Sequence, residues 1–143
     1  MQYKYFYIVF ICSFVGFISC EKEPQKGKYK GEFTGQYVDD TMSYKYSTIY
    51  YFEVTRSTKK ELRLMEKQSQ ITSILHKHKN DSISGMIGFG SVFKPNENIS
   101  SGFNIVKIYG KYDKTSIYGK FSTTFTDGNK EYVSEGDFKL RLY

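Results

Sequence analysis

The 143-residue sequence contains no tryptophan, two histidines and two cysteines, so it lacks most of the residues that build metal sites and disulfide frameworks. His76 and His78 would share one face of a strand, but two ligands make an incomplete metal site. No nucleophile elbow, zinc-protease helix motif or phosphate-cradling glycine loop is present. We therefore expect a protein without metal or organic cofactor and without nucleophilic catalysis.

Charge is nearly absent from the start of the chain. Lys4 is the only charged residue before Glu21, and residues 5–18 are almost wholly apolar or aromatic. A bilayer-spanning helix needs roughly 20 apolar residues, so this run is short. A basic start, a short apolar core and a small residue before a boundary are typical of a secretory signal peptide. We expect residues 1–19 to be removed, with an uncleaved membrane anchor as the alternative.

The boundary itself reads Phe17-Ile18-Ser19-Cys20, which resembles the lipobox of bacterial lipoproteins. The resemblance implies that the Cys20 thiol carries diacylglycerol, that the leader is cut before Cys20, and that a further acyl chain joins the new amino terminus. One acyl chain gives only marginal membrane attachment, whereas two or three hold a protein stably. Because Cys12 lies in the leader, the mature chain would have no cysteine pair for a disulfide.

The residues after Cys20 are polar and include a proline and a glycine. We expect 20–27 to form a lipidated cysteine followed by a flexible tether. Charges directly after the cysteine resemble the signal that sends some Gram-negative lipoproteins to the outer face of the cell, although a solvated spacer would look the same. The prediction is a cell-envelope protein, lipid-anchored in the outer membrane, and export excludes nucleic acid as a partner.

Residues 28–143 alternate between apolar and polar positions, which predicts β-strands in one domain. Asp127-Gly128-Asn129 is a strong hairpin signal, because glycine supplies the positive φ that such a turn requires. Further breaks fall at 39–40, 56–58, 79–81 and 95–98. The predicted inward positions are Tyr29, Gly31, Phe33, Gly35, Tyr37, Tyr44, Tyr46, Thr48, Tyr50, Phe52, Val54, Ile117, Gly119, Phe121, Thr123, Phe125, Tyr132, Ser134, Gly136, Phe138, Leu140 and Leu142.

The breaks separate four more expected strands, near 61–66, 70–77, 82–89 and 102–111. The region 59–79 also carries helix-forming residues at a partly helical spacing, so a helix remains an alternative there. About eight antiparallel strands in chain order favour an all-β meander that closes into a barrel and so removes exposed edges. A β-sandwich is the second possibility.

Gly27-Lys28-Tyr29 resembles the Gly-x-Trp motif that opens lipocalins, with tyrosine in place of tryptophan. Lipocalins also lay a basic side chain of the last strand across that aromatic ring. The resemblance therefore implies a lipocalin-like barrel in which Arg141 packs on Tyr29 in a cation–π contact.

Four predicted inward tyrosines, Tyr44, Tyr46, Tyr50 and Tyr132, could line a ligand cavity with apolar walls and a few hydroxyls. They could equally be ordinary packing, since an eight-stranded barrel can be filled by its own side chains. We expect a non-enzymatic module that binds a small apolar or glycan ligand. The alternatives are an assembly partner of other envelope proteins with a filled barrel, or a hydrolase using the carboxylates at 39–40 or 135–137.

Overall fold

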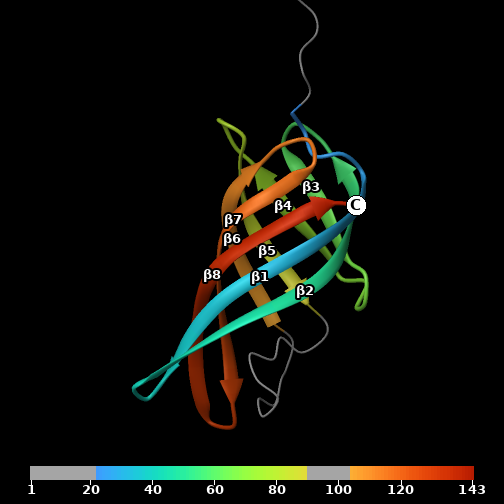
Figure 1. Cartoon of the computed structure of the whole chain (residues 1–143). Coiled ribbons are helices and arrows are strands. Elements are labelled where there is room, and N and C mark those ends of the chain that lie inside the picture. Colours follow the sequence, from blue (N-terminus) through green and yellow to red (C-terminus); the bar gives the residue numbers. More distant parts are fainter. Residues whose placement is uncertain (1–21, 90–103) are drawn as a thin grey trace, which may run out of the picture.

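The computed structural model describes residues 22–89 and 104–143, without the side chains of Asn104 and Asp127. The lipobox, Cys20 and the break at 95–98 lie outside these residues. The described chain forms eight antiparallel strands and no helix (Figure 1). The strands are β1 (Gly27–Asp39), β2 (Met42–Ser57), β3 (Glu61–Glu66), β4 (Thr72–Lys77), β5 (Ser82–Phe89), β6 (Asn104–Tyr112), β7 (Ser116–Asp127) and β8 (Lys130–Leu142).

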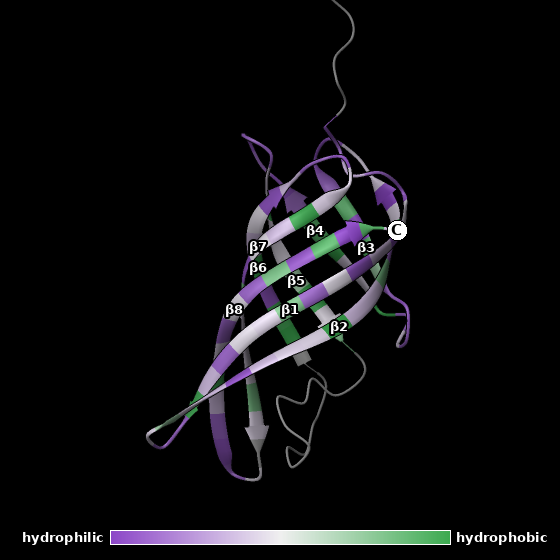
Figure 2. Ribbon diagram, viewed as in Figure 1, coloured by the Kyte–Doolittle hydropathy of each residue, from purple (hydrophilic) through white to green (hydrophobic). Residues whose placement is uncertain are grey.

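The strands form a meander that closes into a barrel. Each strand pairs with the next, and β1 pairs with β8 from Tyr29↔Leu142 to Tyr37↔Ser134. This last pairing closes the sheet, so the all-β, lipocalin-like barrel architecture is confirmed and the sandwich alternative is wrong. Hydrophobic and hydrophilic residues alternate along the strands, as Figure 2 shows for the visible face.

The region 59–79 is a strand hairpin, so the helix alternative is wrong. β3 and β4 pair along their length, and β3 has the predicted bounds. The turn between them is held by the buried carboxylate of Glu66, which accepts a hydrogen bond of 2.7 Å from the backbone N–H of Ser69. Gln70, where the fourth strand was expected to begin, has a φ of 58° and belongs to this turn instead.

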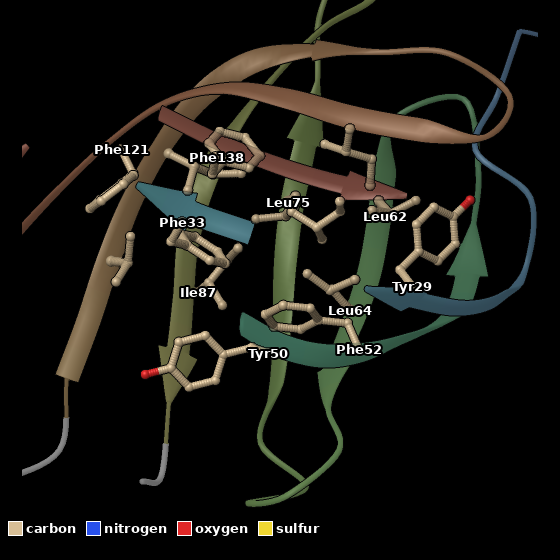
Figure 3. Close-up of a cluster of buried hydrophobic side chains, with 14 of the residues drawn as sticks. Tyr29, Phe33, Tyr50, Phe52, Leu62, Leu64, Leu75, Ile87, Phe121 and Phe138 are labelled. Carbon is tan, nitrogen blue, oxygen red and sulfur yellow. The ribbon is translucent and has the colours of Figure 1, made fainter. Parts of the chain in front are cut away.

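Phe33 occupies the centre of the barrel and is fully buried. Figure 3 shows it among the aromatic and aliphatic side chains that point inward from several strands. Its ring centroid lies within 5.5–6.3 Å of five other aromatic rings, those of Tyr50, Phe52, Phe89, Phe121 and Phe138. Rings at this spacing leave no room for a ligand between them, so this part of the barrel is filled by its own side chains.

Gly136 permits the close approach of β8 to β1. A Cβ atom placed there would lie 2.1 Å from the carbonyl oxygen of Thr34 and 2.5 Å from the Cα of Gly35. No side chain fits in that space, so the facing pair Gly35 and Gly136 allows the sheet to coil tightly enough to close.

The segment from Lys22 to Lys26 lies against the barrel, which corrects the expectation of a flexible tether for this part of the chain. The hydroxyl of Tyr29 donates to the carbonyl of Gln25 at 2.9 Å, and the N–H of Gln25 donates to the carbonyl of Lys114 at 3.1 Å. Glu23 lies 3.5 Å from the buried ammonium of Lys77.

The meander gives the barrel two distinct ends. The tether end carries residues 22–26 and the loops 58–60, 78–81 and 113–115. The hairpin end carries the turns 40–41, 67–71 and 128–129. In Figure 1 the described chain starts at the top, while the tips of the β1–β2 and β7–β8 hairpins lie at the bottom.

Within the described ranges, no helix is long and apolar enough to cross a membrane.

Candidate functional site: an aromatic cluster at the hairpin end

The β1–β2 and β7–β8 hairpins extend beyond the closed part of the barrel. β2 pairs with β1 from Met42 to Val54, but it pairs with β3 only from Phe52 onward. Likewise, β7 pairs with β6 only up to Thr123. The four strands β2, β1, β8 and β7 therefore continue together as a sheet at the hairpin end. Side chains that face the interior elsewhere reach the mouth of the barrel here.

Tyr37, Tyr44, Phe125 and Tyr132 meet on this sheet, and we call them the aromatic cluster. Tyr37 stacks on Tyr44 at 5.1 Å and meets Phe125 edge-on at 5.2 Å. Phe125 in turn stacks on Tyr132 at 5.1 Å. Tyr44 is 39% exposed, whereas the other three are buried. The cluster thus presents one accessible ring, Tyr44, stacked on the buried ring of Tyr37, which itself packs against Phe125 and Tyr132.

Lys130 joins the tips of the two hairpins next to this cluster. Its ammonium contacts the carboxylates of Asp39 and Asp40, the latter at 2.9 Å. The same nitrogen lies 5.3 Å from the ring centroid of Tyr132. Hydrogen bonds to the two carboxylates raise the pKa of Lys130 above its usual value, so its ammonium stays protonated over the whole physiological pH range.

Tyr46 links the aromatic cluster to the backbone of the sheet. Its hydroxyl lies 2.5 Å from the Oγ of Ser134, which itself donates to the carbonyl of Gln36 at 3.0 Å. Since Ser134 uses its proton on Gln36, the Tyr46 hydroxyl is the donor to Ser134. Burial raises the pKa of Tyr46 to about 12, against the lowering effect of the Ser134 hydrogen bond.

The four tyrosines predicted to line a ligand site do not all lie together. Tyr50 belongs to the filled centre, where its ring lies 4.5 Å from that of Phe89, and burial raises its pKa. Tyr132 and Tyr44 belong to the aromatic cluster, and Tyr46 packs against both groups. Among these four tyrosines, the exposed ring is therefore that of Tyr44, at the mouth of the barrel.

The predicted contact between Tyr29 and Arg141 is not formed, which corrects the expectation drawn from lipocalins. The register pairs Tyr29 with Leu142 and places Arg141 opposite Lys30. Tyr29 is fully buried and Arg141 is exposed, so their side chains lie on opposite faces of the sheet. The ring of Tyr29 is held instead by its hydrogen bond to Gln25.

The carboxylates considered for hydrolysis lie in two separate places. Asp39 and Asp40 bind Lys130 at the hairpin tip. Glu135 and Asp137 line an open hollow of about 700 Å³ on the outer face of the sheet, where Asp137 pairs with Lys120 at 2.6 Å.

The two histidines point to the outside of the barrel. His76 is exposed, and the Nε2 of His78 lies 2.7 Å from the Oγ of Ser84. Within residues 22–89 and 104–143, no three metal-ligating side chains come together.

Lys77 is the residue that the sequence reasoning missed. Its side chain is fully inaccessible, and its ammonium donates to the Oγ of Ser57 at 2.8 Å and to the carbonyl of Thr58 at 2.7 Å. Burial lowers the pKa of Lys77, while Glu23 opposes that shift. The alternating pattern of β4 does indicate this burial, because Lys77 lies two residues after the buried Leu75 and so faces the same side of the sheet.

No protein-family model, curated protein or solved structure matches this chain.

Proposed function

We propose that this chain is a lipid-anchored protein of the cell envelope, held at the outer membrane through Cys20, that binds a small apolar or glycan ligand without catalysis. The binding surface is the aromatic cluster at the hairpin end. The observation that carries this proposal is the Tyr37–Tyr44 stack, in which a supported ring is 39% exposed at the end opposite the tether.

The chemistry of the cluster suits a ligand with flat apolar faces and hydroxyl groups. An exposed tyrosine offers an apolar ring and one hydroxyl that can donate or accept. Lys130, Asp39 and Asp40 add charged hydrogen-bonding groups at the rim of the same surface. Apolar walls with a few convergent polar groups are typical of small-molecule sites. The apolar face of a sugar ring can also stack on an exposed aromatic side chain.

The position of the tether indicates that the aromatic cluster faces away from the membrane. Lys22 is the second residue after Cys20, and it lies at the tether end of the barrel, 3.6 Å from Asp81. A lipid on Cys20 would hold this end at the membrane and direct the aromatic cluster away from it. A ligand in the surrounding compartment would then meet Tyr44 first.

An assembly role is the second candidate, and two observations favour it. The barrel centre is filled around Phe33, and β2 pairs with no described strand on its outer edge from Met42 to Ile49. Ile49 and Tyr51, on the outward face of the same strand, are 49% and 48% exposed. An unpaired edge with exposed apolar side chains can take a strand from another protein.

The anchor is tested by metabolic labelling with palmitate. The wild-type chain should incorporate label, and the Cys20→Ala variant should not. The Cys12→Ala variant is the matched control and should be labelled like wild type. Undiminished labelling of the Cys20→Ala variant would rule out the anchor.

The binding surface is tested on an array of oligosaccharides and with a hydrophobic fluorescent dye. Replacing Tyr44 by alanine should weaken binding to the retained probe about 5- to 150-fold, if stacking on its ring contributes on the order of 1–3 kcal/mol as it does for flat ring ligands. Tyr109→Ala is the matched control, since Tyr109 is 66% exposed on the outer face. Equal binding by both variants would contradict the assignment of the binding surface to Tyr44. In a separate experiment, crosslinking of a photoreactive residue at position 49 to an envelope protein would favour the assembly role.

A further inference from the structure

We propose that the tether end of the barrel is itself a membrane-contact surface, whose loop lysines bind the headgroups of anionic lipids. This inference extends the proposed lipid anchor, because it adds a second contact between the same end of the protein and the bilayer. It assigns a role to residues that take no part in the aromatic cluster.

Lysines gather on every loop of the tether end. They are Lys22 and Lys26 ahead of β1, Lys59 and Lys60 between β2 and β3, Lys79 between β4 and β5, and Lys114 between β6 and β7. All six are exposed. Among the described residues, only Lys22 of these six forms an ion pair. Five ammonium groups on four neighbouring segments therefore face solvent without a carboxylate partner in the described structure.

The three carboxylate side chains within residues 22–26 and the loops 58–60, 78–81 and 113–115 are already engaged. Glu23 faces the buried ammonium of Lys77, and Asp81 lies 3.6 Å from Lys22. Asp113 accepts hydrogen bonds of 2.8 Å from the backbone N–H groups of Thr115 and Ser116. These carboxylates are thus engaged by ammonium or backbone N–H groups of the fold, while five of the six exposed lysines have no ion-pair partner among the described residues.

The opposite end has no comparable lysines in its described loops. Its only one is Lys67, whose ammonium is paired with Glu53 at 3.0 Å. Near the hairpin tips, Lys130 is taken up by Asp39 and Asp40. Among the described residues, unpaired positive charge is therefore concentrated at the tether end, which is the end that a lipid on Cys20 would hold.

The packed tether brings these lysines close to the bilayer. Because Lys22 to Lys26 lie against the barrel, only Glu21 separates Cys20 from the described chain. Two residue steps span at most about 7 Å, so the start of the described chain at Lys22 lies within about one screening length of Cys20, about 8 Å at physiological ionic strength. A lysine that reaches an anionic surface at this end would strengthen binding about fivefold.

An open hollow at this end offers a place for a headgroup phosphate. Its volume is about 880 Å³, and its walls include Lys59, His78, Lys79 and Ser82. These side chains offer ammonium and hydroxyl donors around one shallow, open hollow. A headgroup phosphate there can accept charge-assisted hydrogen bonds from the lysines.

The test is amine-reactive footprinting of the native lipoprotein reconstituted into vesicles. Vesicles of phosphatidylcholine alone are compared with vesicles that also contain phosphatidylglycerol. We expect Lys59, Lys79 and Lys114 to lose reactivity severalfold in the anionic vesicles, and to recover it in high salt. Lys45 and Lys139, on the outer faces of β2 and β8, serve as internal controls and should react equally in both. Equal reactivity of the tether-end lysines in both lipids would overturn the proposal.

A charge variant separates the lysines from the anchor. In the triple variant Lys59→Gln, Lys60→Gln and Lys79→Gln, most of the severalfold protection of Lys114 by phosphatidylglycerol should be lost. The matched variant Lys45→Gln, Lys107→Gln and Lys120→Gln loses the same charge from the sides of the barrel and should keep that protection. Protection by an acidic polysaccharide but not by phosphatidylglycerol would overturn the proposal in favour of a glycan partner. Flotation with phosphatidylcholine vesicles reports the acyl anchor separately, so its loss would refute the anchor and not the lysine contact.

Discussion

The ammonium of Lys77 lies 3.5 Å from the carboxylate of Glu23, and the lysine side chain is fully inaccessible while that of Glu23 is 33% exposed. This pair joins the segment ahead of β1 to the tether end of the barrel. A buried charge is costly unless it is paired and hydrogen-bonded, and here Ser57 and Thr58 accept the other two protons of the ammonium. The pair therefore fixes where the chain enters the barrel.

Replacing Glu23 by glutamine should lower the free energy of unfolding by about 1–2 kcal/mol, since the ammonium of Lys77 stays buried without its counter-charge. The partial exposure of Glu23 keeps the effect below that of a fully buried pair. The measurement is urea denaturation at neutral pH.

The matched control for that variant is Glu32→Gln. Glu32 also lies 3.5 Å from a lysine, Lys30, but both side chains of that pair are more than 40% exposed. We expect a change of less than about 0.5 kcal/mol there. If Glu23→Gln lowered the free energy of unfolding no more than Glu32→Gln does, the Glu23–Lys77 pair would not hold the tether. The same would follow if Glu23→Gln had an equal effect in a Lys77→Met background.

Phe33→Ala should be among the most destabilising single substitutions in the chain, with a loss of about 3–5 kcal/mol. Five rings surround Phe33 and cannot all collapse into the space it leaves. Tyr44→Ala, at the exposed mouth, should cost about 1 kcal/mol or less by the same denaturant titration. Similar losses at the two positions would mean that the barrel centre is not tightly packed.

Gly136→Ala should destabilise by at least about 2 kcal/mol, because the new methyl group would lie 2.1 Å from a backbone oxygen of β1 and the strands would have to separate. Gly128→Ala provides the comparison. Gly128 has a φ of 58° and open space around its Cβ position, so only the cost of about 1 kcal/mol for a left-handed alanine applies. Thermal unfolding of both variants checks the order, and a milder effect at Gly136 would contradict the close approach of β8 and β1.

Stability should fall between pH 10 and 12 as the tyrosines of the unfolded chain ionise. Burial raises the pKa of Tyr29 and of Tyr46 from 10.0 to about 12. A raised tyrosine pKa stabilises the fold fully below pH 10, and this contribution is lost as pH rises through the folded value. Each residue adds a slope of up to about 1.4 kcal/mol per pH unit in that window.

The Tyr46→Phe variant checks this pH dependence. Denaturant unfolding measured at several pH values should give a shallower alkaline slope than the wild-type chain gives. Tyr118→Phe is the control, since Tyr118 is 41% exposed. An unchanged slope in Tyr46→Phe would show that its hydroxyl ionises as easily in the fold as in the unfolded chain.

The strands were predictable because alternation is a local property of the sequence. β3 and β5 have the expected bounds, and the inward parity of β1, β7 and β8 was found from residues such as Phe33, Phe121 and Phe138. The alternation of apolar and polar residues predicts which face of the sheet a side chain lies on, but not how deeply it is buried. Tyr44 has inward parity yet is exposed, because its part of β2 lies beyond the closed barrel.

The features that were missed depend on contacts between distant segments. Tyr29 and Arg141 are adjacent in register only through the closure of β1 on β8, and a shift of one residue places them on opposite faces. The packing of Glu23 against Lys77 likewise requires the barrel to bring β4 to the start of β1. No local pattern around residues 22–26 indicates this, because the segment itself is short and polar.

Intact mass spectrometry of the protein isolated from its native envelope tests the central proposal, the lipid anchor, most directly. The account predicts a chain that begins at Cys20 and carries the added mass of a diacylglycerol and an acyl chain. A chain that still contains residues 1–19, or one that begins at Cys20 with a free thiol and a free amine, would contradict it.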